Sequence, residues 1–575
     1  MNSRKESLKK HLLGLPYVFD LTTTEIDMLT HNVDKAVLHV IEDDGADEAI
    51  RMIDAAASWY HIPHAEGCRN FSGENDFLAI RLICALYEKE CYDKLPQKTK
   101  DNLKTFFTKD NYRSIYGSEN HAIIFRAARI LAAQFYKDEY FENAGMSGEE
   151  CYKADEKYIR EFILFRAKYG WGEFDSLGYS AEVIMVLVTL YRYLADDSLR
   201  DVCRKMTDVI LLDMIEDSLG YFYGGAHGRS YPRRVIYRNG CGMSCLYRYY
   251  FGTDFEGNAM MPSVNVYLSN YVPSEIVRRI AANPVTPRES RERKHLHLMS
   301  AWTHEILRDR IEAETGSISK YTYVCEDYSI GAVNHQDDYS PLSTAMDRSY
   351  AHHQQLEWEF TLPSSEHKIF SHHLGIPDYH NINNRWTGDR GCSCGSFYSS
   401  KDTVVAMYNI DNREKTDIIN AYIPLDAFKK HVLDGKYVFL EYGKLYVSVY
   451  FDNGYEICRD QNDEFCDKEF ISRGWQNAVV LRVRYAADFG SFEEFTSYIK
   501  SLPVIFDREK REVTFDGIRL TRNDNFVDGK QNIYPYPATY DSPIMYSEWG
   551  SGKIEIICED EKTVYDFSRD CRAES

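Results

Sequence analysis

The residues best suited to chemistry in this sequence lie in three short polar segments between strongly apolar stretches. The first segment is residues 118–121 (SENH), the second is 171–179 (WGEFDSLGY) and the third is 227–234 (HGRSYPRR). Each lies in a loop or at the expected start of a helix, where binding and catalytic groups are usually placed on a rigid scaffold. Together they supply an amide, imidazoles, phenols and guanidiniums, and the sequence has neither a phosphate-binding loop nor a nucleotide fingerprint. This set of groups predicts chemistry on carbohydrates.

Asn120, His121 and Tyr179 are the residue types that β-elimination of a uronic acid polymer requires. The reaction removes the weakly acidic proton at C5 of the sugar, and it needs hydrogen-bond donors that neutralise the neighbouring carboxylate. A tyrosine or a histidine takes this proton, and an acid protonates the leaving glycosidic oxygen. Structural alternatives exist for each residue, since Asn120 could cap a helix, His121 could be a core histidine and Tyr179 could serve packing.

The third segment concentrates positive charge in a chain that is otherwise acidic. Arg229, Arg233, Arg234 and Arg238 lie within ten residues of one another, and arginine recognises carboxylate or sulfate groups through two parallel hydrogen bonds. The alternative is a solvated basic stretch that pairs with local acids. The expected substrate-binding residues are Glu119, Trp171, Glu173, His227, Arg229, Tyr231, Arg234, His352 and Trp386. Among them, Trp386 is either a platform for a sugar ring or a buried side chain.

Hydrolysis is the main competing reaction. Glu119 and Glu173, or Asp175 in place of Glu173, could flank a glycosidic bond from the same cleft, and two carboxyl groups are the usual equipment of a glycosidase. A third hypothesis is a carbohydrate-binding protein without catalytic activity. The products separate the three hypotheses: a lyase leaves an unsaturated uronate that absorbs ultraviolet light, a hydrolase leaves only new reducing ends, and a binding protein leaves neither.

Helices must position these groups in the first part of the chain. Apolar residues recur with helical spacing in several stretches, and glycine, proline or capping residues separate them. These stretches are 77–87, 123–135, 158–165, 181–194 and 202–215. Residues 183–191 are apolar around almost the whole circumference of a helix, which indicates burial on more than one side. The inner ring of a double-layered (α/α) toroid has this property, so we expect an N-terminal toroid.

The pattern of apolar residues in the sequence changes after about residue 315. Short segments rich in β-branched and aromatic residues alternate with turns, as antiparallel strands do. These segments include 321–325, 356–362, 403–408, 437–450, 479–483, 512–515 and 553–557. Helices followed by strands indicate two domains, here an (α/α) toroid in residues 1–315 and an antiparallel β-sandwich in residues 316–575. The predicted fold class is therefore α+β with more than one domain.

The order of these features resembles the heparinase II/III-like and oligoalginate lyases, a group of polysaccharide lyases. The resemblance rests on an Asn-His pair at a helix start, a tyrosine about two helices later and a β-rich second half, and it covers most of the chain. It implies that Asn120 and His121 neutralise the substrate carboxylate and that Tyr179 acts from the toroid. It also implies that a histidine of the sandwich completes the site.

His353, which follows His352, is the best match for the histidine of the sandwich, because it directly precedes a clear strand segment. The pair His372 and His373 is the rival. The sequence therefore predicts a lyase that cleaves a glycan containing uronic acid, with catalytic residues Asn120, His121, Tyr179 and His353. The identity of the glycan, its linkage and the choice between endo and exo cleavage are left open.

Composition and charge exclude several classes of protein. The chain has 575 residues, of which 44% are hydrophobic, enough to build more than one core. Its 68 basic and 89 acidic residues give a net charge of −21, which argues against a nucleic acid or an anionic membrane as partner. The expected partner is an acidic oligosaccharide or polysaccharide, and self-association into a homo-oligomer is left open.

The compartment and the cofactors are inferred from smaller signals. The fourteen cysteines are scattered, as in reduced cytoplasmic proteins. The N-terminus lacks the apolar core of a secretory signal, and no stretch approaches the ~20 apolar residues of a spanning helix. We therefore expect a cytoplasmic protein without a cofactor. His335, Asp337 and Asp338 form either a structural divalent metal site in the β-domain or, as the pattern favours, a group of hydrated surface residues.

Overall fold

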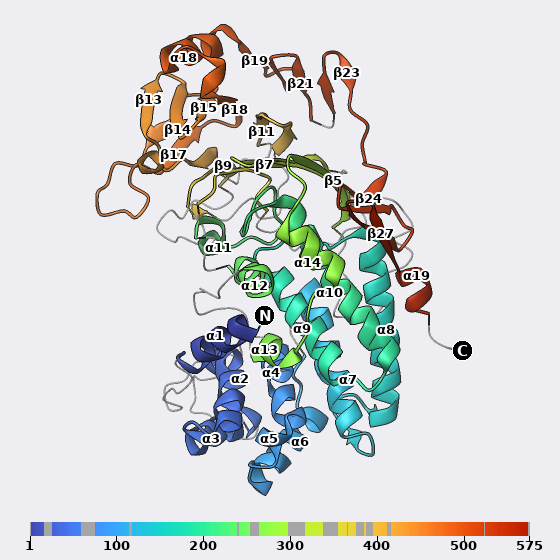
Figure 1. Ribbon diagram of the computed structural model, residues 1–575. Coiled ribbons are helices and arrows are strands. Elements are labelled where there is room, and N and C mark those ends of the chain that lie inside the picture. The colour runs from blue at the N-terminus through green and yellow to red at the C-terminus, as the bar shows by residue number, and fades with distance from the viewer. Residues whose placement is uncertain are drawn as a thin grey trace.

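The computed structural model describes most of the chain, with gaps. The described residues are 2–15, 26–58, 75–113, 118–237, 241–252, 264–296, 317–336, 355–364, 366–374, 385–386, 395–410, 416–522 and 524–572. Helices occupy the first half and antiparallel strands the second, and Figure 1 shows them at opposite ends of the molecule. The α+β class predicted from the sequence is therefore what the structure has.

The helices of the first half, called the helical region below, are mostly three to six turns long. Their bounds are α1 Asn2–Leu13, α2 Ile26–Glu42, α3 Ala46–Ser58, α4 Asn75–Tyr87, α5 Lys89–Tyr92, α6 Gln97–Lys109, α7 Glu119–Phe135, α8 Gly148–Tyr169, α9 Tyr179–Tyr193, α10 Asp197–Asp217, α11 Pro232–Ile236, α12 Gly242–Phe251, α13 Val264–Ser269 and α14 Glu275–Ala282. Two small hairpins interrupt them, β1 Tyr140–Phe141 with β2 Met146–Ser147, and β3 Ser218–Leu219 with β4 Phe222–Tyr223.

Packing within the helical region follows the predicted apolar faces. Helix α9 is buried from Ala181 to Leu190, as its uniformly apolar sequence predicts. It contacts α7, α10, α12 and α13, while α2 contacts α4 and α13, and α4 contacts α7.

Ser118 caps α7 by accepting a hydrogen bond from the His121 backbone N–H at 3.5 Å, and Ser147 and Glu150 form a capping box at the start of α8. Within the described residues, no helix has the length and apolarity needed to cross a membrane.

The strands that the structure describes in the second half form three antiparallel sheets. The large sheet has twelve strands in the order β16-β17-β12-β9-β8-β7-β6-β5-β24-β25-β26-β27, the middle sheet has six in the order β10-β11-β18-β15-β14-β13, and the outer sheet has five, β19 to β23. The strand bounds are β5 Arg288–His295, β6 Ser317–Val324, β7 Ser329–Gln336, β8 Trp358–Thr361, β9 Lys368–His373, β10 Gly395–Ser399, β11 Thr403–Asn409, β12 Ile418–Tyr422, β13 Lys430–Asp434, β14 Tyr437–Tyr442, β15 Leu445–Phe451, β16 Glu456–Ile457, β17 Glu469–Arg473, β18 Gln476–Tyr485, β19 Val504–Asp507, β20 Glu512–Phe515, β21 Ile518–Leu520, β22 Asn525–Val527, β23 Lys530–Gln531, β24 Ala538–Asp541, β25 Met545–Glu548, β26 Lys553–Cys558 and β27 Glu561–Asp566. Two further helices, α18 Phe492–Ser501 and α19 Phe567–Asp570, follow β18 and β27.

The sheets are stacked in layers, and strand β11 shows how the sequence specifies the stacking. Val404 and Ala406 lie in the apolar core between the middle and large sheets, whereas Val405 and Met407 lie in the core between the middle and outer sheets. Successive side chains of a strand point to opposite faces. A strand covered on both sides therefore needs apolar residues at successive positions, as the segment VVAM (residues 404–407) has.

The first strand of the large sheet lies earlier in the chain than the sequence predicted. Strand β5 pairs along its length with β6 and also pairs with β24, so the expectation of helices up to residue 315 is wrong for residues 288–295. The segment RESRERKH has no alternation of apolar and polar residues. Several of its charged side chains are buried, and a search for apolar alternation cannot detect such a strand.

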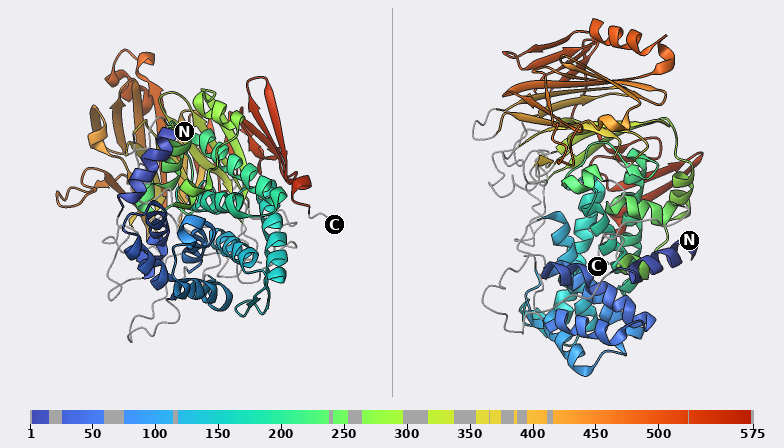
Figure 2. Two further views of the ribbon diagram at one scale, coloured as in Figure 1. Left: turned by 60° about the horizontal axis from the view of Figure 1, so that its bottom comes forward. Right: turned by 90° about the vertical axis from the view of Figure 1, so that its left-hand side faces the viewer.

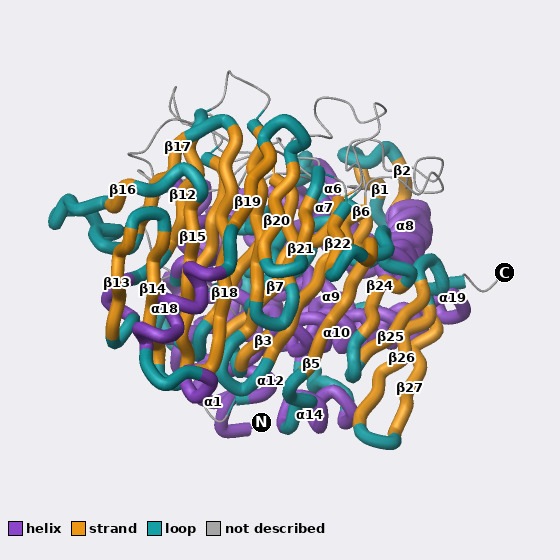
Figure 3. The backbone as a smooth tube through the Cα atoms, turned by 90° about the horizontal axis from the view of Figure 1, so that it is seen from above, coloured by secondary structure: helices purple, strands orange, loops and turns teal. Residues whose placement is uncertain are grey.

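Helices and strands meet along the large sheet. Strands β24 to β27, which form one end of the large sheet, lie beside the helices, where β26 contacts α8 and α14 (Figure 1). Helix α10 contacts β5 and β6. Figure 2 shows the helical region on one side of the sheets, and Figure 3, which is seen from above relative to Figure 1, shows the strands spread across it. The loops before α9 and before α11 lead toward this junction, and they carry the residues singled out from the sequence.

Candidate functional site

Two loops of the helical region are bonded to each other and form the base of the site. One loop, residues 170–178, joins α8 to α9, and the other, residues 224–231, joins β4 to α11. The Gly228 N–H donates to the Phe174 carbonyl at 2.7 Å, and the Ser176 hydroxyl donates to the Arg229 carbonyl at 3.1 Å. These contacts fix the two loops against each other, although the loops lie far apart in the sequence.

Each loop contains a residue in the left-handed backbone region. Asp175 has a φ of 49° and Arg229 has a φ of 48°. Such conformations cost about 1–3 kcal/mol for a residue other than glycine, and they persist where the surrounding contacts over-determine them. Strain of this kind concentrates at functional sites, and here it lies on both sides of the contact between the loops.

A chain of hydrogen bonds links five of the residues predicted from the sequence. The Asn120 amide donates to both carboxylate oxygens of Glu173, at 2.9 and 2.7 Å. Arg229 donates from one terminal nitrogen to Glu173 at 3.1 Å and from the other to the Tyr179 hydroxyl, also at 3.1 Å. The Tyr179 hydroxyl donates to the Tyr231 hydroxyl at 3.0 Å. The structure thus brings the amide of α7, the carboxylate before α9 and the two phenols into one network.

The charges in this network favour a neutral phenol beside a fixed cation. Burial raises the pKa of Tyr179, and the nearby Arg229 guanidinium opposes this effect. The guanidinium carbon lies 4.6 Å from the centre of the Tyr179 ring. Burial also acts against the charged form of Arg229, but Glu173 and Tyr179 together raise its pKa. Tyr179 can therefore hold a proton at neutral pH, and Arg229 is placed to stabilise the phenolate that forms when the proton leaves.

Arg234 reaches the same phenols because residue 178 is a glycine. Its guanidinium carbon lies 5.6 Å from the centre of the Tyr179 ring and 5.5 Å from that of Tyr231. A Cβ atom at Gly178 would lie 1.5 Å from one terminal nitrogen of Arg234, so any other residue would displace the guanidinium. That nitrogen is buried without a hydrogen-bond partner. Arg234, Tyr179 and Tyr231 are each partly exposed, so they are the members of the group that a ligand can reach.

Asn120 and His121 are oriented differently from the expectation. Asn120 directs its N–H groups to Glu173, and its buried Oδ1 has no hydrogen-bond partner. The His121 Nδ1 lies 2.8 Å from an Asp76 carboxylate oxygen. In this arrangement Asn120 offers an acceptor, whereas neutralising a substrate carboxylate requires donors.

Glu119 stabilises the loop before α9. Its carboxylate accepts hydrogen bonds from the Gly172 and Glu173 N–H groups, at 3.3 and 2.7 Å, and forms an ion pair with Arg166. Burial raises the pKa of Glu119, and Arg166 opposes this effect. The hydrolase hypothesis assigns Glu119 a proton-transfer role, but both oxygens of the carboxylate are engaged in holding the loop.

The two tryptophans predicted to bind substrate are packed inside the protein. Trp171 is 6% exposed, and its ring lies 5.9 Å from that of Phe162. Trp386 is 2% exposed and stacks on His372 at 6.0 Å, so it is buried and does not form an exposed platform for a sugar. His372 and His373 are also buried, with the His373 Nε2 at 2.8 Å from the Thr416 carbonyl. His352 and His353 lie outside the described residues.

His227 joins the helical region to the sheet. It is fully buried, and its backbone exchanges two hydrogen bonds with Leu356, at 2.9 and 2.8 Å. Its Nδ1 donates to the Asp175 carbonyl at 2.7 Å. The substrate-binding role predicted for His227 does not fit its complete burial. Its contacts instead tie the two loops of the site to the residues before β8.

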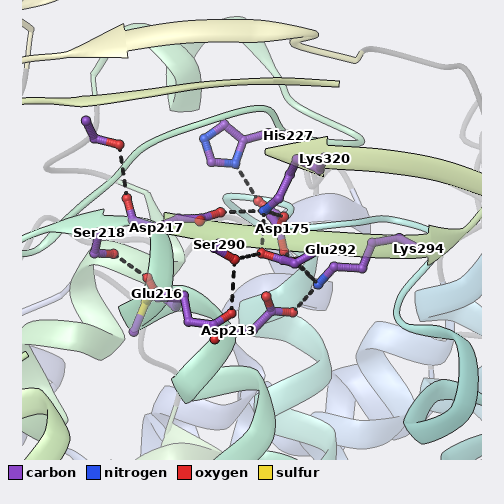
Figure 4. Close-up of polar contacts among 12 residues, drawn as sticks. Asp175, Asp213, Glu216, Asp217, Ser218, His227, Ser290, Glu292, Lys294 and Lys320 are labelled. Carbon is purple, nitrogen blue, oxygen red and sulfur yellow. Dashed lines mark hydrogen bonds and ion pairs between the residues drawn. The ribbon is translucent and has the colours of Figure 1, made fainter. Parts of the chain in front are cut away.

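Behind the loops lies a buried network of charges, shown in Figure 4. The Asp175 carboxylate forms ion pairs with Lys294 of β5 and Lys320 of β6. Lys320 is shared with Asp217, at the end of α10. Three further carboxyl groups belong to the network, those of Asp213, Glu216 and Glu292. The network therefore has more carboxyl groups than ammonium groups, and burial of the excess negative charge requires protons on some of them.

A metal ion does not fit this network. Asp175, Asp213 and Glu292 are the one group of three potential ligands found among the described residues. The Lys294 ammonium, however, lies 3.5, 2.5 and 2.6 Å from these three carboxylates, so a cation already occupies their centre. The sequence leaves open a second metal site at His335, Asp337 and Asp338, but both aspartates lie outside the described residues. The His335 ring stacks on the Tyr534 ring at 5.2 Å.

The network predicts a pH dependence of stability. Burial raises the pKa of Asp217 to about 7, against the opposing effect of Lys320, whereas an aspartate in an unfolded chain has a pKa of about 3.9. Between these values the folded protein binds more protons than the unfolded chain, so its stability falls as the pH rises, by roughly 4 kcal/mol at most from this group. Denaturant unfolding of wild type and Asp217→Asn at about pH 5 and pH 8 measures this. The asparagine of the variant resembles the protonated acid, so we expect the variant to lose less stability than wild type between about pH 5 and pH 8. An equal loss in both proteins would contradict the raised pKa of Asp217.

The sequence did not reveal two parts of this arrangement. Gly178 belongs to the second polar segment, but its sequence position does not indicate that the absence of a side chain there makes room for Arg234. Lys294 and Lys320 were not singled out. A lysine inside a strand segment, such as Lys320 in SISKYTYV, is the one signal that could have indicated them, since a buried lysine requires an acidic partner.

Comparison with known proteins finds similarity of structure alone. No protein-family model and no curated protein match the sequence. Heparinase III has a TM-score of 0.45 at 9% identity, with 93% of this chain and 85% of that chain covered. A mutant of heparan sulfate lyase HepC from Pedobacter heparinus has a TM-score of 0.39 at 8% identity, covering 91% and 85%. The chondroitin AC lyase of Streptomyces coelicolor A3, solved with chondroitin sulphate, has a TM-score of 0.40 at 10% identity, covering 98% and 88%. Heparinase III and two other polysaccharide lyases are thus among the solved structures to which this chain is similar.

Proposed function

We propose that the protein is a lyase that cleaves a uronic-acid-containing glycan by β-elimination. The observation that carries this proposal is the hydrogen-bonded chain from Glu173 through Arg229 to Tyr179. It places a phenol that can transfer a proton against a cation that stabilises its anion. A glycosidase needs two carboxyl groups that reach the substrate, and here the Glu119 and Glu173 carboxylates are already bound to other groups of the site.

Tyr179 is the proposed proton donor to the leaving oxygen. The base removes the proton from C5 of the uronate, the electron pair forms the double bond between C4 and C5, and the bond from C4 to the glycosidic oxygen breaks. The leaving oxygen takes the Tyr179 proton, and Arg229 stabilises the resulting phenolate until the proton is restored. The direction of the Tyr179 pKa shift supports this role. His353, which the sequence predicts as a catalytic residue, is the proposed base.

The Arg234 guanidinium is better suited than Asn120 to neutralise the substrate carboxylate. It is partly exposed beside Tyr179, and one of its terminal nitrogens has no hydrogen-bond partner. We assign Asn120 the task of holding Glu173, which in turn holds Arg229. His121 supports α7 through Asp76. This division of roles replaces the one inferred from the family resemblance, in which the Asn-His pair contacts the substrate.

The architecture proposed around this site is an (α/α) toroid followed by a β-sandwich. A closed ring of contacts supports the toroid: α2 contacts α4, α4 contacts α7, α7 contacts α9, α9 contacts α13, and α13 contacts α2. The apolar core between the large and middle sheets supports the sandwich. In this architecture the site lies where the toroid meets the large sheet, and the substrate is an acidic oligosaccharide or polysaccharide.

A product assay tests the proposed reaction. Purified protein is incubated separately with hyaluronan, chondroitin sulfate, heparan sulfate and alginate oligosaccharides, and both ultraviolet absorbance and reducing ends are followed. We expect equal formation of unsaturated uronate and of reducing ends on at least one substrate. Reducing ends without new absorbance would show hydrolysis instead, and binding without either product would show a carbohydrate-binding protein.

Arg234 and Gly178 should act as one unit in substrate binding. In Gly178→Ala the new methyl group displaces the Arg234 guanidinium, so affinity for an acidic oligosaccharide should fall about tenfold, the value of one hydrogen bond to a charged group. Arg234→Gln should have the same effect, and the double variant should be no weaker than either single one. Isothermal titration with a cleavage-resistant oligosaccharide measures this. Additive losses in the double variant would show that Gly178 does not act through Arg234.

A further inference from the structure

The loop that carries Glu173 and leads into Tyr179 is bound on its other side by charged residues of the large sheet. Asp175 lies between these two residues in the sequence, and its carboxylate points to Lys320 of β6, as Figure 4 shows. Its carbonyl turns toward His227 in the other loop of the site and accepts a hydrogen bond at 2.7 Å. One residue thus connects both loops of the site to the sheet.

The ion pair between Asp175 and Lys320 is charged in the folded protein. Burial acts against charge on Asp175, but Lys294 and Lys320 outweigh it and lower its pKa. Burial likewise acts against charge on Lys320, but Asp175 and Asp217 raise its pKa well above the usual range. Both groups are fully buried, where opposite charges attract strongly and an unpaired charge is costly. The pair can therefore hold Asp175 in its strained left-handed conformation.

We propose that Asp175 and Lys320 are positioning residues for the site, and that their ion pair keeps Glu173 and Tyr179 aligned with Arg229. The kinetic part of this proposal rests on the proposed lyase function, but the structural part does not. Hydrogen bonds from the Gly228 N–H to Phe174 and from the Glu173 N–H to Glu119 report on the alignment directly. Loss of the ion pair should loosen both loops while the helices behind them stay folded.

Asp175→Asn and Asp217→Asn form a matched pair that tests the proposal. Both carboxylates are buried, and both bind the same Lys320 ammonium, but only Asp175 belongs to a loop of the site. Hydrogen–deuterium exchange should become faster in residues 172–179 and 227–229 of Asp175→Asn and should be unchanged there in Asp217→Asn. On a cleaved substrate, kcat should fall about tenfold or more in Asp175→Asn with little change in KM, because small displacements of reacting groups are costly. Asp217→Asn should keep the wild-type kcat.

A change in exchange or in kcat of equal size in the two variants would overturn the proposal, because it would show that the network only stabilises the fold. If Asp175→Asn fails to fold, Asp175→Glu and Asp217→Glu, which keep the charges but displace the carboxylates relative to Lys320, replace the two asparagine variants in the same comparison. If no glycan is cleaved, the proposed function fails, while the exchange experiment still decides between positioning and stability alone.

Discussion

The Tyr179→Phe variant is expected to lose about 10²–10⁴-fold in kcat, the usual contribution of a general acid or base, with little change in KM. Phenylalanine keeps the ring beside the Arg229 and Arg234 guanidiniums, so substrate binding should be preserved. It removes the hydroxyl that accepts from Arg229 and donates to Tyr231. The measurement is steady-state formation of unsaturated uronate by equal amounts of folded wild type and variant.

Tyr191→Phe provides the matched control for this experiment. Tyr191 lies on the same helix α9 and is partly buried, and its ring packs on Tyr271 away from the loops of the site. The control should cleave substrate at the wild-type rate. A Tyr179→Phe enzyme as fast as this control would exclude Tyr179 as the proton donor, whatever the reaction.

Arg229→Lys is expected to have the second largest effect, a loss of about 10²–10³-fold in kcat, as found when a donor that stabilises a developing oxyanion is removed. Arg229 bonds Glu173 with one terminal nitrogen and Tyr179 with the other. A lysine keeps the charge but has a single nitrogen on a flexible chain, so it cannot reproduce the planar fork. The loss should appear in kcat because the interaction strengthens as the phenolate forms.

Arg233→Lys tests whether this loss is specific. Arg233 is exposed and lies one residue from Arg234, so its replacement makes the same chemical change outside the network. Equal kcat values for the two variants would show that Arg229 contributes only positive charge. Thermal unfolding of both variants should be compared with wild type, because Arg229 is buried and its replacement also affects stability.

The positions of the site residues could be predicted because they follow from local signals. The polar segments precede or begin apolar runs with helical spacing, and the structure begins α7 at Glu119 and α9 at Tyr179. The strand-like segment 437–450 is also confirmed, as the antiparallel strands β14 and β15. Periodicity and capping act over a few residues, so a single sequence contains the information needed to place these elements.

The directions of the side chains could not be predicted, because they depend on contacts between distant segments. Asn120 bonds Glu173, which is 53 positions away in the sequence. Asp175 bonds Lys320, which is 145 positions away. Strand β5 is the extreme case, since its buried Lys294 pairs with the distant Asp175 and Asp213 as well as with Glu292 of its own strand. Burial of paired charges leaves no apolar pattern, and the network behind the site was missed for this reason.

Cleavage in water enriched with heavy oxygen tests the central claim most directly. Hydrolysis adds the elements of water across the glycosidic bond, whereas β-elimination adds none. The proposed lyase should therefore release products without heavy oxygen, each cleavage giving one unsaturated uronate, as mass spectrometry of the oligosaccharides would show. One heavy oxygen atom incorporated per cleavage, together with a saturated product, would contradict the account and assign the site to a hydrolase.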